Sequence, residues 1–537
     1  MIPVSPNNKT QNVMDSASTP VLSQEPNSAV AELAAEQKSV DALSTEHLHA
    51  DLKGRSVRGG VLTLTSQGTQ FVIQSVATVV LARLLTPADF GLVAMVTSIT
   101  GLGSAFADLG LSEATIQRRE ISHAQVSALF WINIAVGLGL TALTAALSPI
   151  LVWFYKEPRL RDITLVVSLT FLISGLRVQH DALLKRQMRF MAIAIRDIVS
   201  VAIAVPIAIV LALRGAGYWA LVALPLVLNC TQMLLSWLMV RWTPGLPKRN
   251  AGVRSMVAFG GNVAASYFIS TVNRSADNVL VGWYCGAGPL GLYSKAYNLL
   301  MLPVRQLSAP VGSVAVPAFS RIQSDPERFA RYYLRLVNLI MWISAPVFGL
   351  LFVAARPVIV TVLGNQWHAA APVFQILAIS ALGQLLLDST IWLLVSRGQS
   401  KRLLRFLLVI SPILIGSFAV GLPFGIKGVA LSGSIALILI FPWILKFSFR
   451  DTELTLQRLG RSILYPISTC LGCVVLGEIG LYALAPKRLI SQMLVALISF
   501  VIGYALSMLV APVREEVMSL KKLFAELRQP GVAAQAA

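Results

Sequence analysis

Apolar runs of about 20 residues recur along the chain from Val61 onward, separated by short polar connections. An apolar helix of about 20 residues spans the roughly 30 Å hydrocarbon core of a bilayer. We therefore predict an all-α membrane protein with about fourteen transmembrane helices and no polar loop large enough to fold as a catalytic domain. The predicted spans are 61–82, 91–111, 125–153, 162–178, 194–213, 218–240, 254–283, 290–318, 332–354, 371–395, 403–422, 427–446, 461–484 and 489–511.

The composition supports this interpretation. Of 537 residues, 55% are hydrophobic and 13% are charged, against about 25% charged residues in soluble domains, and the mean hydropathy is +0.71. These values exclude a water-soluble enzyme. Residues 1–50 differ, because they are polar and acidic and contain no apolar stretch of the signal-peptide type. We expect a disordered tail there.

The net charge of +19 would indicate a nucleic-acid partner in a soluble protein. Here the Lys and Arg residues of the predicted connections are distributed unevenly: one side of the membrane has 28 of them and the other has nine. This asymmetry is the positive-inside pattern, and it places both termini in the cytoplasm. Topology thus accounts for most of the basic charge, and we expect no nucleic-acid partner.

The chain contains an internal repeat at an offset of 200 residues. The segment LARLLTPADFGL at 81–92 aligns with VGWYCGAGPLGL at 281–292. Six spans separate the copies, so both enter the membrane in the same orientation, and we expect two lobes related by an axis along the membrane normal. Chance similarity between apolar helices is the alternative. The predicted parts are a disordered polar cytoplasmic tail (1–55), an N-terminal six-helix lobe (56–245), a C-terminal six-helix lobe (246–450), an extra helix pair (451–513) and a cytoplasmic C-terminal tail (514–537).

Polar and charged side chains form stripes inside three spans. The first span carries Gln67, Gln70, Gln74 and Thr78, the seventh carries Arg274 and Asp277, and the eighth carries Lys295, Asn298, Arg305 and Ser308. Ionisable groups within a membrane are costly and usually face a cavity or a partner. The cations outnumber Asp277, which suits an anionic head group such as a pyrophosphate. Two alternatives remain, namely a structural salt bridge between Arg274 and Asp277 and snorkelling of Arg305 to the interface.

Other motifs carry no chemistry. The GxGxxG match at 286–291 lacks a surrounding βαβ unit and is interpreted as a turn. Cys470 and Cys473 have CxxC spacing but lie in an apolar span without further ligands, so we expect core residues. We therefore predict no catalytic residue, no metal site, no cofactor and no enzymatic activity.

Several segments together resemble the polysaccharide flippases, the Wzx-like members of the polysaccharide transporter family, and among these the colanic-acid type of exporter. The resemblance covers about residues 55–450. It rests on LARLLTPADFGLVA (81–94), LSEATIQRRE (111–120), LLKRQMRF (183–190), NRSADNVLVGWYCGAGPLGLYSKAYNL (273–299) and VIVTVLGNQWHAAAPVFQIL (358–377).

The resemblance implies a multi-pass protein of the bacterial inner membrane that flips polyprenyl-pyrophosphate-linked oligosaccharide units for capsule, exopolysaccharide or O-antigen export. It implies a V-shaped, MATE-like pair of six-helix lobes that works by alternating access around a central cavity. The residues implied for that cavity are Gln70, Gln74, Arg274, Asp277, Lys295 and Arg305. The implied partners are the lipid-linked oligosaccharide, the lipid bilayer and the polysaccharide polymerase or export machinery.

Two other functions remain as alternatives. A drug or cation antiporter of the same superfamily would favour a cavity with net acidic charge, whereas the predicted stripes carry an excess of cations. A membrane-embedded polymerase or glycosyltransferase would need acidic residues on sizeable loops, and the predicted loops are short.

Overall fold

The computed structural model describes residues 52–107, 110–118, 121–240, 242–246, 268, 271–272 and 274–518. Every regular element in these ranges is a helix, which confirms the all-α class for this part of the chain. Ten helical stretches within it are long and apolar enough to cross a membrane, and one of them, Ser400–Ser448, covers two predicted spans. The protein is thus a multi-pass membrane protein, while the count of fourteen stays a prediction. Most of both predicted tails lies outside the described residues.

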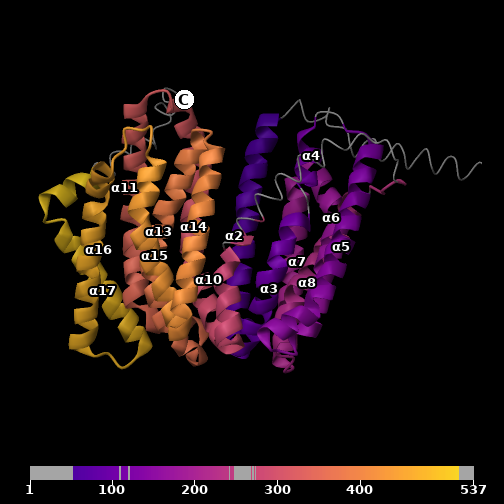
Figure 1. Ribbon diagram of the computed structural model, residues 1–537, viewed down its shortest axis with the longest axis horizontal. Coiled ribbons are helices and arrows are strands. Elements are labelled where there is room, and N and C mark those ends of the chain that lie inside the picture. The colour runs from indigo at the N-terminus through magenta and orange to yellow at the C-terminus, as the bar shows by residue number, and fades with distance from the viewer. Residues whose placement is uncertain are drawn as a thin grey trace, which may run out of the picture.

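The helices form two groups that lie side by side (Figure 1). The first group contains α2 (Leu52–Leu84), α3 (Pro87–Ala107), α4 (Leu111–Gln117), α5 (His123–Tyr155), α6 (Leu160–Arg186), α7 (Phe190–Leu213) and α8 (Tyr218–Val240). The second contains α10 (Ala287–Ile322), α11 (Pro326–Val353), α12 (Ala355–Leu363), η2 (Asn365–Ala370), α13 (Ala371–Ser396), α14 (Ser400–Gly421), η3 (Leu422–Phe424), α15 (Gly425–Ser448), α16 (Leu456–Leu484) and α17 (Leu489–Ser507). Each predicted span overlaps one of these helices, but 91–111 reaches past the end of α3 to the first residue of α4, and of 254–283 only the part from 274 onward is described as a continuous helix.

Local sequence explains where several of these helices begin. A helix satisfies its own backbone hydrogen bonds in lipid, but its first N–H groups need other acceptors. At α5 the Ser122 side chain accepts from the backbone N–H of Gln125, and the Gln125 side chain accepts from the backbone N–H of Ser122. Asp325 caps α11 and Thr455 caps α16 in a similar way. Polar residues between the apolar runs therefore fix the helix boundaries.

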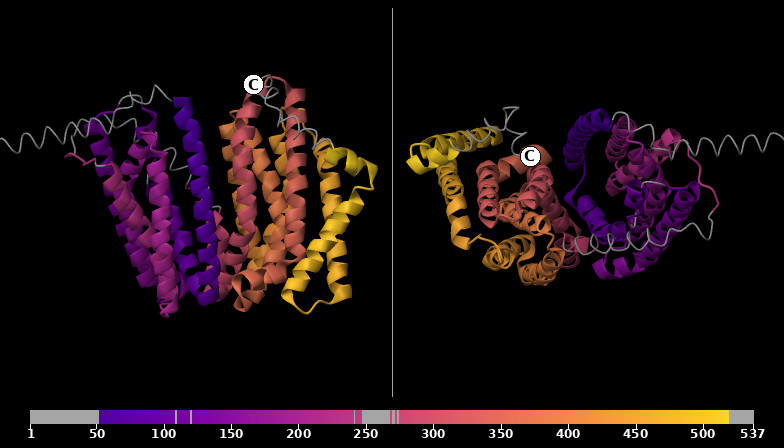
Figure 2. Two further views of the ribbon diagram at one scale, coloured as in Figure 1. Left: turned by 180° about the vertical axis from the view of Figure 1, so that it is seen from behind. Right: turned by 90° about the horizontal axis from the view of Figure 1, so that it is seen from above.

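The two groups meet near one end of the molecule, through α3 and α10 (Figures 1 and 2). At the opposite end, the start of α2 stands apart from the start of α14 (Figure 1). The main apolar core is continuous across the contact, because Leu92 and Met95 of α3 belong to the same buried cluster as Leu290 and Leu300 of α10. The contact is thus a packed interface between helices that are remote in sequence.

The closest approach in this interface involves two glycines at the repeat offset. A Cβ atom added to Gly91 would lie 1.7 Å from the carbonyl oxygen of Ala287, and one added to Gly291 would lie 1.8 Å from the carbonyl oxygen of Pro87. No side chain fits at these distances, so only glycine permits this backbone contact. At the offset of 200 residues, positions 87 and 91 correspond to positions 287 and 291. The contact of 91 with 287 therefore recurs, with the two segments exchanged, as the contact of 291 with 87, which is what a local two-fold relation requires.

At the same end of the molecule, side chains from η2 form hydrogen bonds with the end of α2. Trp367 donates its indole N–H to the carbonyl oxygen of Ala82 at 2.8 Å, and Gln366 donates to the carbonyl oxygens of Ala82 and Leu85 at 2.5 and 2.9 Å. In return, Arg83 donates to the carbonyl oxygen of Thr361 at 2.5 Å. The last carbonyl groups of α2 are therefore satisfied by side chains of the other helix group. We call this set of hydrogen bonds the η2 lock.

Candidate functional site

Helix α10 divides the predicted site residues into two sets. Lys295 and Arg305 both lie on this helix, ten residues apart. At about 100° and 1.5 Å per residue, their side chains are separated by about 15 Å along the axis and by about 80° around it. The sequence pattern placed both residues in one polar stripe, but they do not share a face of α10. Lys295 lines a cavity against the first helix group, and Arg305 lines a second cavity within the other group.

The first cavity, called here the apolar cavity, has a volume of about 280 Å³ and lies among α2, α3, α7, α8 and α10. Aliphatic side chains such as Val205 and Leu224 form most of its wall, and its polar groups are Gln74, Thr78 and Lys295. No carboxylate lines it among the described residues. Among the described residues, the apolar cavity is thus a hydrocarbon-lined space with a single cation.

Lys295 reaches across the boundary between the two helix groups. Its ammonium nitrogen lies 4.1 Å from the ring centroid of Phe90, on α3. A cation over an aromatic face is stabilised by the negative potential of the ring. Within the described part of the chain Lys295 forms no ion pair. Its positive charge therefore remains free to attract an anion.

The second cavity, called here the polar cavity, has a volume of about 370 Å³ and lies among α10, α13, α14, α15 and the helical residues just before α10. It combines basic, acidic, phenolic, amide and hydroxyl groups. They are Arg274, Asp277, Tyr293, Tyr297, Arg305, Ser380, Gln384, Asp388, Ser411 and Ser434. Two arginines and two aspartates give it no net formal charge from the described residues, in contrast to the apolar cavity.

Both carboxylates of the polar cavity are held by neutral donors. Asp277 accepts from the Tyr293 hydroxyl at 3.0 Å and from the backbone N–H of Asn278 at 2.7 Å. Asp388 accepts from the Ser308 hydroxyl at 2.5 Å and from the Gln384 amide at 3.1 Å. The alternative of a salt bridge between Arg274 and Asp277 is not observed, and neither Arg274 nor Arg305 pairs with a carboxylate in the described part of the chain.

The remaining candidate from the sequence, Gln70, takes a different place. Its amide donates to the Ser66 hydroxyl one turn earlier on α2, at 3.0 Å. It lines neither the apolar nor the polar cavity. Of the six predicted site residues, two therefore lie at the apolar cavity and three at the polar cavity. Their assignment to a substrate remains a prediction.

Residues of the polar cavity that the stripes did not reveal include Tyr293, Tyr297 and Gln384. A sequence signal for them exists, because Tyr293 and Tyr297, like Gln384 and Asp388, are four residues apart and share a helix face. The two tyrosine rings lie nearly parallel, with centroids 6.5 Å apart and an angle of 12° between their planes. The polar cavity thus offers aromatic surface beside hydrogen-bonding groups.

One buried cation of the first helix group has a structural partner set instead. Arg196 on α7 forms ion pairs with Asp181 of α6 and with the adjacent Asp197, the latter at 2.7 Å. Arg177 pairs with the other oxygen of Asp181 at 3.2 Å. Two arginines and two aspartates thus neutralise one another between α6 and α7. This network stabilises the helix packing and leaves no charge for a ligand.

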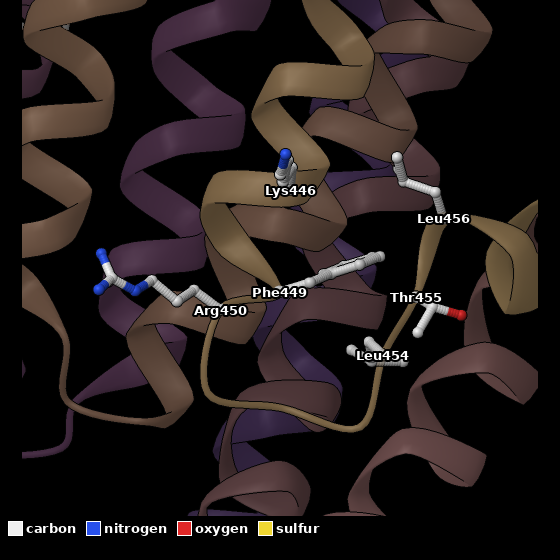
Figure 3. A pocket seen from close by; sticks show the side chains of 6 residues that line it. All are labelled: Lys446, Phe449, Arg450, Leu454, Thr455 and Leu456. Carbon is white, nitrogen blue, oxygen red and sulfur yellow. The ribbon is translucent and has the colours of Figure 1, made fainter.

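Two further features lie away from these cavities. Figure 3 shows a third cavity, of about 510 Å³, which includes Lys446, Phe449 and Arg450 at the connection between α15 and α16 and none of the predicted site residues. Cys470 and Cys473 are buried free thiols, and Cys470 contacts the carbonyl oxygen of Ala345 at 3.0 Å. They are core residues of the packing between α11, α16 and α17, as the sequence predicted.

Two solved membrane-protein structures share this fold. The lipid II flippase MurJ in an inward closed conformation superposes with a TM-score of 0.67, at 14% identity over 83% of this chain and 99% of that one. An inward-facing multidrug resistance MATE family transporter superposes with a TM-score of 0.54, at 13% identity over 73% of this chain and 99% of that one. At these identities the likeness concerns the fold.

Relatives in sequence have names from polysaccharide biosynthesis. The teichuronic acid biosynthesis protein TuaB of Bacillus subtilis is 25% identical over 61% of this chain and 68% of its own length. The lipopolysaccharide biosynthesis protein WzxC of Escherichia coli is 28% identical over 56% of this chain and 62% of its own length. The model of the family described as polysaccharide biosynthesis protein matches residues 80–372, more than half of the chain. The chain therefore belongs to the polysaccharide biosynthesis protein family.

Proposed function

We propose that the protein is a flippase that moves polyprenyl-pyrophosphate-linked oligosaccharides across a bacterial inner membrane for polysaccharide export. The observation that carries this proposal is a set of three cations at cavities between membrane-spanning helices, none of which pairs with an acidic side chain of the described residues: Lys295, Arg274 and Arg305. Arg274 and Arg305 are exposed and Lys295 is half-buried, and ionisable groups placed within membrane spans usually face a cavity or a partner. An anionic head group that needs shielding from lipid would supply the missing partner.

Transport is proposed to work by alternating access between the lobes at 56–245 and 246–450. In this proposal the chain has fourteen spans, both termini lie in the cytoplasm, and the helix pair at 451–513 is an addition to the two lobes. The contact at Gly91 and Gly291 would then lie on the periplasmic side, since α2 begins at the opposite end. The first turns of α2 and α14, which stand apart from each other, would face the cytoplasm (Figure 1). This arrangement supports a conformation that receives substrate from the cytoplasmic leaflet.

A cation antiporter is a second candidate, and the carboxylates Asp277 and Asp388 in the polar cavity are the observation in its favour. The two arginines of the same cavity offset their charge, and the apolar cavity contains a cation. An efflux assay with organic cations separates the two functions, because the flippase is expected to give no resistance or efflux.

The proposed flippase activity is tested with Lys295→Gln and Arg305→Gln in a strain whose own copy of the gene is deleted. We expect surface polysaccharide to fall at least tenfold and lipid-linked repeat units to accumulate inside the cell, at unchanged protein level. The matched control is Lys487→Gln, which removes one exposed charge from the connection between α16 and α17, two helices that line neither cavity. Normal surface polysaccharide from both cavity variants would contradict the proposal.

A further inference from the structure

The two cavities differ in chemistry in a way that fits the two halves of one amphipathic molecule. We propose, resting on the proposed function, that the apolar cavity holds the phosphate group and the adjoining hydrocarbon of the lipid, and that the polar cavity holds the sugar. Lys295 is then the residue that contacts the anion, whereas Tyr297, Gln384 and the two aspartates contact sugar hydroxyls. The three cations thus do not act together on one pyrophosphate, as the sequence alone suggested.

The wall of the apolar cavity argues for hydrocarbon. Leu81, Val205, Leu224 and Leu228 present only aliphatic carbon, and removing apolar surface from water is favourable in proportion to its area. A free sugar would leave most of its hydroxyl groups without hydrogen bonds there, which is costly. Lys295 adds one positive charge at the edge of this surface, next to Phe90. A ligand that carries an anion directly attached to a hydrocarbon chain satisfies both features.

The polar cavity argues for a neutral ligand with many hydroxyl groups. Each carboxylate there accepts two hydrogen bonds from protein groups and retains further lone pairs. Arg274 and Arg305 have donors that no carboxylate of the described residues occupies. A hydroxyl group both donates and accepts, so one sugar ring can bond to acids and arginines at once. A bare pyrophosphate would instead meet Asp277 and Asp388 as like charges.

Aromatic surface supplies a second element of sugar recognition. The rings of Tyr293 and Tyr297 lie nearly parallel on α10, and Tyr297 lines the cavity beside Arg305. The flat C–H faces of a pyranose ring pack against such an aromatic face as apolar groups do. The phenol hydroxyl at the ring edge can donate to the same sugar.

The positions of the two sets on α10 are compatible with one ligand. Lys295 and Tyr297 are two residues apart, so they point to nearly opposite sides of the helix at about the same height. An α-helix with its side chains is about 10–12 Å across. A molecule that binds at both cavities would straddle α10, with its anion on one side and its sugar on the other.

Binding to the purified full chain in lipid nanodiscs tests this division. The probes are undecaprenyl pyrophosphate and its derivatives with oligosaccharides of glucose, galactose or N-acetylglucosamine, which are long enough to reach from one side of α10 to the other. For the wild type, we expect at least one sugar-bearing probe to bind more tightly than undecaprenyl pyrophosphate. Lys295→Gln should weaken binding of all probes at least tenfold. Tyr297→Leu should remove the additional affinity of the sugar-bearing probe and change binding of undecaprenyl pyrophosphate less than twofold, and Tyr297→Phe should retain most of that gain.

Each opposite outcome has a definite meaning. No wild-type binding of any probe would overturn the proposed function together with the division. Wild-type binding without any gain from a sugar, or equal weakening of all probes by Tyr297→Leu, would overturn the division alone. The same holds if Lys295→Gln leaves binding of undecaprenyl pyrophosphate unchanged. Unfolding temperatures within a few degrees of the wild type show that the variants remain folded.

Discussion

Gly91 and Gly291 form a reciprocal contact: each glycine packs against a backbone carbonyl group that lies four residues before the other. The Gly91 position faces the oxygen of Ala287, and the Gly291 position faces the oxygen of Pro87. The two segments of the predicted repeat thus touch at positions that are 200 residues apart. This contact joins the two helix groups at one end of the molecule, and the first prediction concerns it.

Gly91→Ala is expected to destabilise the contact between α3 and α10. The added methyl group would overlap the Ala287 carbonyl group, and overpacking of this kind costs about 1–3 kcal/mol. We expect a lower unfolding temperature in detergent, measured by differential scanning fluorimetry. The control is Gly288→Ala on α10, where an added Cβ meets no atom within 4 Å. An unchanged unfolding temperature for Gly91→Ala would contradict this prediction, because α3 and α10 would then move apart without a loss of stability.

Trp367→Phe is expected to weaken the η2 lock. The substitution retains an aromatic ring beside Phe90 but removes the hydrogen bond to the Ala82 carbonyl oxygen. The Ala82 carbonyl oxygen keeps its hydrogen bond from Gln366, so the cost is that of one lost hydrogen bond, about 0.5–1.5 kcal/mol. We expect a cysteine introduced by Leu85→Cys, at a position that is 3% exposed, to react faster with a water-soluble maleimide when Trp367→Phe is present.

The control for this experiment is His368→Ala, which alters an exposed side chain whose hydrogen bond stays within η2. It should leave the labelling rate of the introduced cysteine unchanged. Equal labelling rates with and without Trp367→Phe would show that the η2 lock does not limit solvent access at this end of the molecule.

Arg196→Gln is expected to destabilise the first helix group strongly. It leaves Asp181 and Asp197 without their shared cation, and breaking a buried ion pair from one side costs about 3–5 kcal/mol. We expect a reduced yield of folded protein and a lower unfolding temperature. Arg214→Gln, at an exposed position after α7, serves as the control and should behave like the wild type. A stable Arg196→Gln variant would refute the structural role of this network.

The unequal distribution of Lys and Arg predicts that both termini lie in the cytoplasm. A green fluorescent protein fused after Ala537 should therefore be fluorescent in a bacterial host, and an alkaline phosphatase fused at the same place should be inactive. A phosphatase fused after Glu157, in the connection between α5 and α6, should be active. The reverse pattern would invert the proposed topology and place the η2 lock in the cytoplasm.

The sequence by itself determined the helices and the family. The length of each apolar run sets where a helix can cross lipid, and capping residues such as Ser122 and Asp325 set where one begins. These are local properties, so they can be recognised without knowing the neighbours. The segments at 81–94 and 273–299 likewise predicted the family that the comparison with its model confirms.

Only the tertiary structure decided how the charged residues are grouped. Lys295 and Arg305 share a helix, yet one faces α7 and α8 and the other faces α13 and α14, since helices from remote parts of the chain surround α10. In the same way, the partner of Asp277 proved to be Tyr293 and not Arg274. A periodic pattern shows which residues share a helix face, but the chemistry of a cavity depends on all the helices that enclose it.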